Sequence, residues 1–218
     1  MIQQKNYNNL EDFLNSSLQS HSVLNINLNQ NKICDEAISG LCSALVKCLN
    51  LSNLTLNLEW NQISAIGASI LGSALASCTN LSNLRLNLYT NKLGDKGSVD
   101  LVSALAKCQN LLNLTLDIGG NQISTFGASG IGSALEIYPN LSNLALYLQW
   151  SQIGEIGAKE LGSSLAKCSN LSNLTLNLGE NYIGNEGVSG LGSSLAKCTK
   201  LSNLTLNLQQ KQFICFLF

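Results

Sequence analysis

Eight cysteines and a single histidine, His21, are the side chains of this 218-residue chain that are best suited to metal binding or nucleophilic chemistry. Zinc sites use cysteine and histidine ligands at short spacings, and His21 lies far from any close pair of cysteines. Free cysteine packs as a small hydrophobic residue, so the regular spacing of five of the cysteines favours a buried structural column over disulfides or metal ligands. These five are Cys48, Cys78, Cys108, Cys168 and Cys198, and Tyr138 stands where one more would fall.

Catalytic motifs are also missing from the sequence. Gly130-x-Gly132 and Gly190-x-Gly192 match half of a dinucleotide-binding fingerprint, but both fall in helical segments without a strand directly before them. The chain contains no Gly-Lys pair for a phosphate-binding loop, and it lacks the HRD and DFG signatures of protein kinases. We predict a non-enzymatic protein without a cofactor or a small-molecule substrate.

Composition restricts the location and the partners. The net charge is −1, and only 11% of the residues are charged. The lysines are dispersed along the chain, which argues against nucleic acid as a partner. No segment approaches the roughly 20 apolar residues that span a bilayer, and the first residues, MIQQKNYNNLEDF, lack the apolar region of a secretion signal. Together with cysteines that are expected to stay reduced, these features predict a cytoplasmic protein that does not bind membranes.

The strands and helices that would position these side chains are predicted from an internal repeat. The phrase LSNLTLNL occurs at 51–58, 171–178 and 201–208, and close relatives occur at 81–88, 111–118 and 141–148. All six starts are 30 residues apart. A fixed period of this length indicates a solenoid, in which each unit buries its apolar face against its neighbours.

One unit, residues 51–80, predicts a strand followed by a helix. Leu54, Leu56 and Leu58 alternate with polar residues, as in a strand with one buried face. From 67 to 77 the apolar residues change to helical spacing. A parallel strand reached through a helix forms a right-handed crossover. The predicted fold class is therefore an α/β solenoid, a right-handed arc with a parallel sheet on the concave face and helices on the convex face.

The repeat LxxLxLxLxxNxIxxxGxxxLxxxLxxCxx resembles the leucine-rich repeat family, specifically its long, ribonuclease-inhibitor-like subclass, over residues 21–210. The resemblance implies that one asparagine per unit satisfies backbone groups in the turn after the strand. Ser151 interrupts this series and Lys211 ends it. Two additional residues before each asparagine predict a longer strand than is usual in the subclass. The asparagines that match are Asn31, Asn61, Asn91, Asn121 and Asn181.

Three regions are expected. Residues 1–20 form an N-terminal capping helix, for which 9–20 supply an amphipathic pattern. Residues 21–208 form the repeat array, with six full repeats and a seventh strand. Residues 209–218, QQKQFICFLF, form an uncapped apolar tail. An uncovered apolar end favours a piece of a longer repeat protein, and the alternative is that FICFLF folds back over the last repeat.

Solvent-facing positions that differ between units predict the binding site. They are the fifth, seventh, ninth and tenth positions of each unit, next to strands about 4.8 Å apart. Tryptophan, tyrosine and arginine often anchor protein interfaces. The alternatives are that the aromatic residues pack on one another or on the turn, and that Arg85 pairs with Asp117 across neighbouring strands. The candidate residues are Glu59, Trp60, Arg85, Tyr89, Asp117, Tyr147, Trp150 and Glu180.

The leading functional prediction is a scaffold-like module that binds a protein partner through the concave strand face. A second hypothesis is a regulator of a partner enzyme, because the architecture is similar to that of the Ran GTPase-activating protein. A third is a recognition segment of a larger protein, such as a kinase or a receptor. The sequence does not identify the partner.

Overall fold

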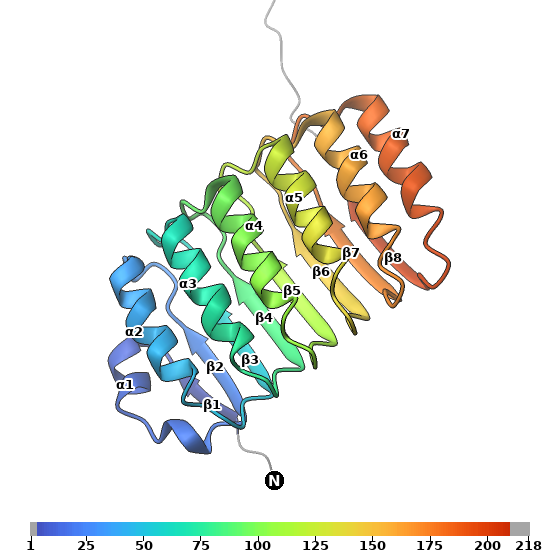
Figure 1. Cartoon of the computed structure of the whole chain (residues 1–218). Coiled ribbons are helices and arrows are strands. Elements are labelled where there is room, and N and C mark those ends of the chain that lie inside the picture. Colours follow the sequence, from blue (N-terminus) through green and yellow to red (C-terminus); the bar gives the residue numbers. More distant parts are fainter. Residues whose placement is uncertain (1–3, 210–218) are drawn as a thin grey trace, which may run out of the picture.

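The computed structural model describes residues 4–209, which form one parallel sheet of eight strands in the order β1 to β8 (Figure 1). The strands are β1 (Gln4–Tyr7), β2 (Val23–Asn27), β3 (Asn53–Asn57), β4 (Asn83–Asn87), β5 (Asn113–Asp117), β6 (Asn143–Tyr147), β7 (Asn173–Asn177) and β8 (Asn203–Asn207). The helices are α1 (Leu10–Leu14), α2 (Asp35–Leu45), α3 (Ala65–Ala76), α4 (Gly94–Leu105), α5 (Thr125–Leu135), α6 (Gly154–Leu165) and α7 (Gly184–Leu195).

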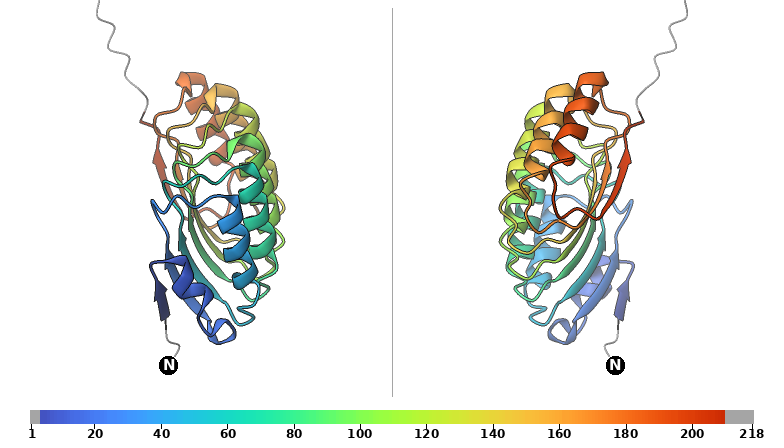
Figure 2. Two further views of the ribbon diagram at one scale, coloured as in Figure 1. Left: turned by 90° about the vertical axis from the view of Figure 1, so that its left-hand side faces the viewer. Right: turned by 90° about the vertical axis from the view of Figure 1, so that its right-hand side faces the viewer.

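The predicted α/β solenoid with 30-residue repeats is confirmed by the register of the sheet. Each strand pairs with the next at the same repeat position, so that Leu54 lies beside Leu84 and Leu84 lies beside Leu114. The helices α2–α7 all cover one face of the sheet (Figure 2). Because a helix is about 10 Å wide and strands are about 4.8 Å apart, the stack curves with the sheet on its inner side.

A single core runs along the whole array, between the sheet and the helices. The leucines at the fourth, sixth and eighth positions of each interior unit are buried, as Leu54, Leu56 and Leu58 are. Small residues bring the helices close together, because a Cβ atom added to Gly72 would lie 2.9 Å from the Cβ atom of Ala104. The core therefore depends on contacts between units more than on contacts within one unit.

The N-terminal region differs from the single capping helix that the sequence predicts. Residues 4–7 form β1, which extends the sheet by one strand beside β2. The predicted helix over 9–20 divides into α1 and a short 3₁₀ helix at Leu18–Ser20. Phe13 is fully buried and packs edge-on against the ring of Tyr7, with 5.4 Å between ring centroids. The predicted tail from residue 210 onward lies outside the described residues.

The asparagine of each turn joins neighbouring units, as the resemblance implies. The Nδ2 group of Asn121 donates to the carbonyls of Leu88 and Ile118, at 2.9 and 3.0 Å, and its Oδ1 accepts from the amide of Leu93 at 3.2 Å. Ser151 stands at the equivalent position in the next unit. Its hydroxyl is buried and has no hydrogen-bond partner among the described residues, so the series is interrupted there.

Backbone pairing continues beyond the strands, which supports the predicted lengthening. The amide of Leu58 donates to the carbonyl of Asn87 at 2.8 Å, and the amide of Trp60 donates to the carbonyl of Tyr89 at 2.9 Å. The tenth position of each unit then turns into the left-handed region. Its residues are Gln30, Trp60, Thr90, Gly120, Trp150 and Glu180, with φ between 54° and 67°.

The helices begin in two different ways, which alternate over the first units. Ser64 and Ser124 cap α3 and α5 with their hydroxyls, and each also donates to an aspartate in the preceding helix. The amides of Ser64 and Ser124 lie 2.9 and 2.7 Å from carboxylate oxygens of Asp35 and Asp95, respectively. The helix α4 instead begins at Gly94, which has a φ of 60°.

Candidate interaction surface

The cysteines, which are the most reactive side chains of the sequence, lie in the core or beside it. All described cysteines are free thiols, and Cys108 donates to the carbonyl of Leu75 in the preceding unit at 3.5 Å. Burial raises the pKa of the Cys48, Cys78 and Cys108 thiols to about 11. These groups are therefore protonated near neutral pH and are poor nucleophiles.

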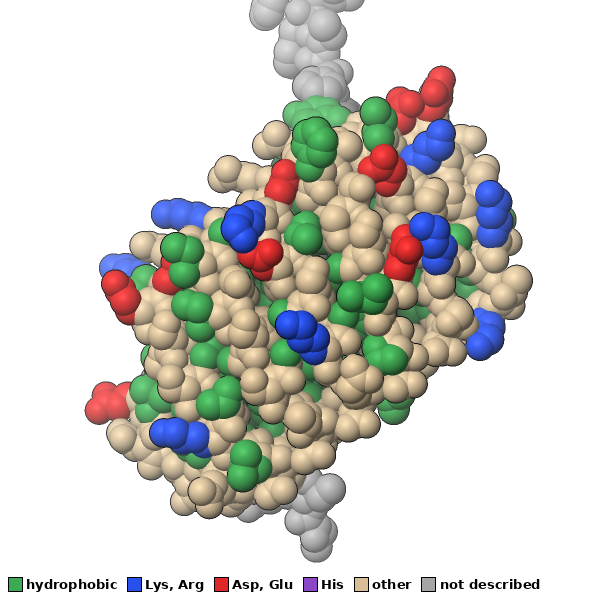
Figure 3. Space-filling view, viewed as in Figure 1, with side chains coloured by type: hydrophobic (Ala, Val, Ile, Leu, Met, Phe, Trp, Pro, Cys, Tyr) green, Lys and Arg blue, Asp and Glu red, His purple; other side chains and the backbone are tan. Residues whose placement is uncertain are grey.

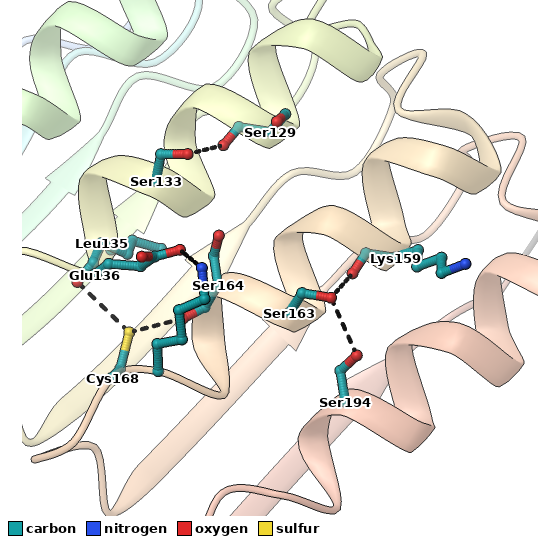
Figure 4. A network of polar contacts seen from close by, with 10 residues as sticks. Ser129, Ser133, Leu135, Glu136, Lys159, Ser163, Ser164, Cys168 and Ser194 are labelled. Atoms are coloured by element: carbon teal, nitrogen blue, oxygen red, sulfur yellow. Dashed lines mark hydrogen bonds and ion pairs between the residues drawn. The ribbon is translucent and has the colours of Figure 1, made fainter.

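The column continues through a tyrosine to Cys168. The Tyr138 hydroxyl donates to the carbonyl of Val102 at 2.7 Å, which replaces the contact of a thiol. The thiol of Cys168 lies between the carbonyls of Leu135 and Ser164, at 3.5 and 3.6 Å (Figure 4). The column therefore connects neighbouring units. Within residues 4–209, no cluster of three or more His, Cys, Asp or Glu residues has the geometry to hold a metal ion.

Trp60 and Trp150 lie in the turns that follow the carboxyl ends of β3 and β6. Each is at the tenth position of its unit, in the left-handed conformation, and is 51% exposed. Such a conformation is costly for a residue other than glycine. Both indoles are therefore carried by the turns that follow β3 and β6.

The first group of candidate residues, Glu59, Trp60 and Tyr89, forms a connected cluster. The rings of Trp60 and Tyr89 meet edge-on, with 6.1 Å between centroids and an interplanar angle of 74°. A carboxylate oxygen of Glu59 accepts from the Nδ2 group of Asn87 at 3.1 Å. We call these three residues the Trp60 cluster. For Trp60 and Tyr89, the structure therefore agrees with the alternative given in the sequence analysis, that the aromatic residues pack on one another.

Asp117 does not pair with Arg85, so the alternative of a salt bridge between them is wrong. Arg85 lies beside Thr115 in the sheet, whereas Asp117 is further along the same strand as Thr115. The carboxylate of Asp117 accepts from the amide of Gly119 at 3.0 Å and from Nε2 of Gln149 at 3.2 Å. Burial raises the pKa of Asp117, and the nearby charge of Glu59 adds to that effect, although the two hydrogen bonds oppose it.

Arg85 instead faces a shallow hollow of about 330 Å³ over the strand face. Its lining includes Asn25, Thr55 and Thr115. A second hollow of about 160 Å³ lies near Ala145, where most other units carry threonine. Asn25, Arg85 and Ala145, which replace threonine at the fifth position, therefore all border depressions in the sheet surface.

The sequence analysis did not predict a ladder of hydrogen-bonded asparagines at the third position of each repeat unit, which is the first residue of each strand. Nδ2 of Asn83 donates to Oδ1 of Asn53 at 2.8 Å, and the side chain of Asn113 continues the series to Asn83. The series runs on through Asn143 and Asn173. The recurrence of asparagine at this solvent-facing position was the available signal. The ladder makes the floor of both hollows polar.

The eight predicted site residues extend over several units, and the two tryptophans lie apart. Trp60 and Trp150 belong to units separated by three strand spacings, about 14 Å at 4.8 Å each. Between them lie Gly119 and Gly120, which carry no side chains, and a side chain at Gly119 would collide with Gln149. Tyr147 lies half-buried beside Asp117 in the sheet. Glu180 lies further along the array, where its amide bonds to Gln209.

Comparison with known proteins is consistent with the repeat. A family model described as "Leucine Rich repeat" matches residues 50–72 and 170–192. No curated protein matches the chain. Among solved structures, an internalin (inlF) from Listeria monocytogenes is similar at 22% identity and a TM-score of 0.46, over 94% of this chain and 60% of that one. The chain thus spans less than two thirds of that internalin.

Two further structures are similar in the same way. An internalin C2 (inlC2) from Listeria monocytogenes has 20% identity and a TM-score of 0.42, over 91% of this chain and 90% of that one. The plant peptide hormone receptor RGFR1, solved in complex with RGF2, has 15% identity and a TM-score of 0.39, over 95% of this chain and 30% of that one. In the described part of the chain, no helix is both long and apolar enough to span a bilayer. Two segments of the chain are thus similar to leucine-rich repeats, and the common register of the strands shows a solenoid of repeated strand–helix units.

Proposed function

We propose that this chain is a non-enzymatic module that binds a protein partner on the strand side of the solenoid. The observation that carries the proposal is where the variation between units lies. The buried leucines of the strands repeat almost unchanged, whereas the exposed strand-side positions five, seven, nine and ten change from unit to unit and carry both tryptophans and the single arginine. Aromatic and charged residues at these exposed positions support recognition by that face, because packing of the core does not require them.

The chemistry of this face favours a partner that is partly apolar and partly basic. The Trp60 cluster combines two aromatic rings with the carboxylate of Glu59. Among the eight candidate residues there are three carboxylates and one guanidinium, that of Arg85. Exposed aromatic residues beside carboxylates suit contacts to apolar and basic side chains. The asparagine ladder and the two hollows would supply hydrogen bonds to the backbone of the partner.

The helical face carries dispersed charges. Lysine side chains are scattered there among acidic ones, without a basic stripe (Figure 3). This supports the expectation that nucleic acid is not a partner. The single helix of 11 or 12 residues in each 30-residue unit supports the assignment to the ribonuclease-inhibitor-like subclass. The free, buried thiols support a cytoplasmic location, where cysteines stay reduced.

A matched pair of triple variants tests the proposal. The first variant combines Trp60→Ala, Tyr89→Ala and Trp150→Ala on the strand side. The control removes three exposed apolar side chains at the starts of helices. It combines Ile66→Ala, Phe126→Ala and Ile156→Ala.

Tagged proteins would be used for quantitative affinity capture from native lysate, followed by mass spectrometry. We expect the strand-side variant to lose proteins that the wild type and the helix-side control both retain. Circular dichroism would verify that each variant is folded. Equal recovery by a folded strand-side variant, or a selective loss in the helix-side control, would refute this placement of the binding face.

A further inference from the structure

The last strand of the array leaves an apolar edge without a neighbour among the described residues. Leu204 and Leu206 in β8 are 45% and 36% exposed, whereas Leu174 and Leu176 at the same positions of β7 are 2% and 0% exposed. The difference arises because β7 has a strand on each side and β8 pairs with β7 alone. An open apolar strand edge is a template for pairing with another chain.

The helix layer ends in the same way. In α3, α5 and α6, a glycine faces the next helix, and a Cβ atom added to Gly132 or Gly162 would lie 2.9 or 2.8 Å from Ser164 or Leu191, respectively. At the equivalent position in α7, a Cβ atom on Gly192 would meet nothing within 4 Å. Within residues 4–209, the edge of β8 and the flank of α7 therefore form one end face that no other element covers.

The backbone groups that face outward at this end follow from the interior units. Leu58, at the eighth position of its unit, donates its amide to the next strand, and the carbonyl of Ser52, at the second position, accepts from the next strand. Even-numbered positions thus point to the following unit. In β8, the amides and carbonyls of Leu204 and Leu206 point to where the next strand would lie.

The sequence of β8 is a palindrome. Residues 203–207 read Asn-Leu-Thr-Leu-Asn in both directions. In an antiparallel pair centred on Thr205, Leu204 of one copy lies opposite Leu206 of the partner subunit. Thr205 then lies opposite Thr205 of the partner subunit. The outward-facing leucines then form the hydrogen-bonded pairs of an antiparallel ladder, and Thr205 forms the non-hydrogen-bonded pair. A two-fold axis perpendicular to the sheet keeps both sets of leucines on the helical side.

The opposite edge of the sheet does not suit head-to-tail stacking. In β1, Lys5 occupies the position that Leu24 holds in β2, and Lys5 is exposed. Stacking β8 on β1 of another copy would place Leu204 beside Lys5 and would bury the ammonium group in the extended core. Burying an unpaired charge is costly, and lysine is a common protection of sheet edges.

We propose that two copies of this chain pair through β8, antiparallel and two-fold, to form a homodimer with one continuous sheet. The contact is isologous, so it closes at two subunits and does not propagate. The proposal concerns the end of the array and does not depend on a partner at the strand face.

The first test measures the mass of the full chain by analytical ultracentrifugation over a micromolar concentration series. We expect a monomer–dimer equilibrium for the wild type. Leu206→Lys places a charge at the edge, where the side chain is exposed in the monomer, and we expect it to raise the dimer dissociation constant by about tenfold or more. Lys5→Gln, at the opposite edge of the sheet, is the control, and it leaves the dimer unchanged. Growth of the wild-type chain beyond two subunits with rising concentration would instead indicate head-to-tail stacking and overturn the proposal.

The second test uses the symmetry axis. In a Cys215→Ser background, Thr205→Cys brings two thiols together at the non-hydrogen-bonded pair, so mild oxidation should give a covalent dimer on non-reducing gels. Thr115→Cys is the matched control from the same column inside the array, and it should remain monomeric on the gel. A dimer that forms equally in both variants would refute the axis.

A third variant ends at Gln209. It should dimerise like the full chain if a second copy covers the edge. A monomeric full chain together with a dimeric shortened variant would instead make residues 210–218 the occupant and overturn the proposal. A monomer in both forms at every concentration would overturn it as well.

Discussion

Residues 171–178 and 201–208 have the same sequence and adopt the same strand, yet they contribute very differently to the core. The leucines of β7 are covered on both sides by equivalent residues, and those of β8 are covered on one side. Identical local sequence therefore gives identical secondary structure but not identical burial. In this chain, the neighbouring unit determines how much each leucine stabilises the fold, as expected for an array held together by contacts between adjacent repeats.

The largest expected effect compares the same substitution in the two strands. Leu176→Ala removes a fully buried side chain and should lower the free energy of unfolding by about 2–5 kcal/mol. Leu206→Ala removes a side chain that is already partly in water and should cost less than about 1 kcal/mol in the monomer. Urea denaturation of dilute protein would measure both. Similar costs would mean that the end of the array is packed like its interior.

A second comparison concerns the asparagines of the turns, such as Asn121, and Ser151, which replaces one of them. Asn121→Ser copies the residue that stands at 151 and leaves the buried carbonyls of Leu88 and Ile118 without their side-chain donor, so it should cost about 1–3 kcal/mol. Ser151→Asn should add roughly 1 kcal/mol by restoring the donor. Asn31→Ser, at the exposed first turn, serves as the control and should have little effect. Thermal unfolding measures all three. No gain from Ser151→Asn would mean that the turn at residue 151 cannot accommodate the asparagine geometry.

Thiol accessibility should follow the same gradient from the interior to the end. Burial raises the pKa of Cys108 to about 11, so only about one part in a thousand is thiolate at pH 8. Cys198, near the end of the array, is only partly buried, although burial also raises its pKa. Under native conditions, an alkylating reagent followed by peptide mass spectrometry should label Cys198 well before Cys108. Labelling of Cys108 at the same rate would indicate frequent opening of the interior units.

The smallest effect is expected at the N-terminal end, where His21 is buried beside Tyr7 and Ser16. Burial lowers the pKa of His21, and the charge of Lys5 lowers it further. The neutral ring is therefore favoured in the folded state. Its contribution to stability is complete above the unfolded pKa of about 6.5 and is lost as the pH falls below that value.

Melting temperatures of the wild type and of His21→Gln between pH 7.5 and pH 5 would test this prediction. The wild type should lose more stability than the variant over that interval. An equal loss in both proteins would assign the acid sensitivity to other groups.

The repeat made most of the architecture predictable. Period-two leucines gave the strands and helical spacing gave the helices, because both patterns recur in phase. The strand β1 could not be predicted, since its residues Gln4–Tyr7 show no apolar alternation and pair only because β2 offers an edge.

The candidate site was predictable in composition but not in arrangement. The left-handed backbone conformation of Trp60 in the turn after β3 cannot be read from the types of the side chains. The separation of Arg85 from Asp117 depends on register, because the two residues differ by two positions along adjacent strands.

The alternating helix starts have a consequence for the history of the chain. Ser64 depends on Asp35, and Ser124 depends on Asp95, each one unit earlier. Excision of a single unit would separate a serine from its carboxylate, whereas excision of residues 61–120 would bring Ser124 beside Asp35. Insertions and losses in this region should therefore be better tolerated in blocks of 60 residues than in blocks of 30.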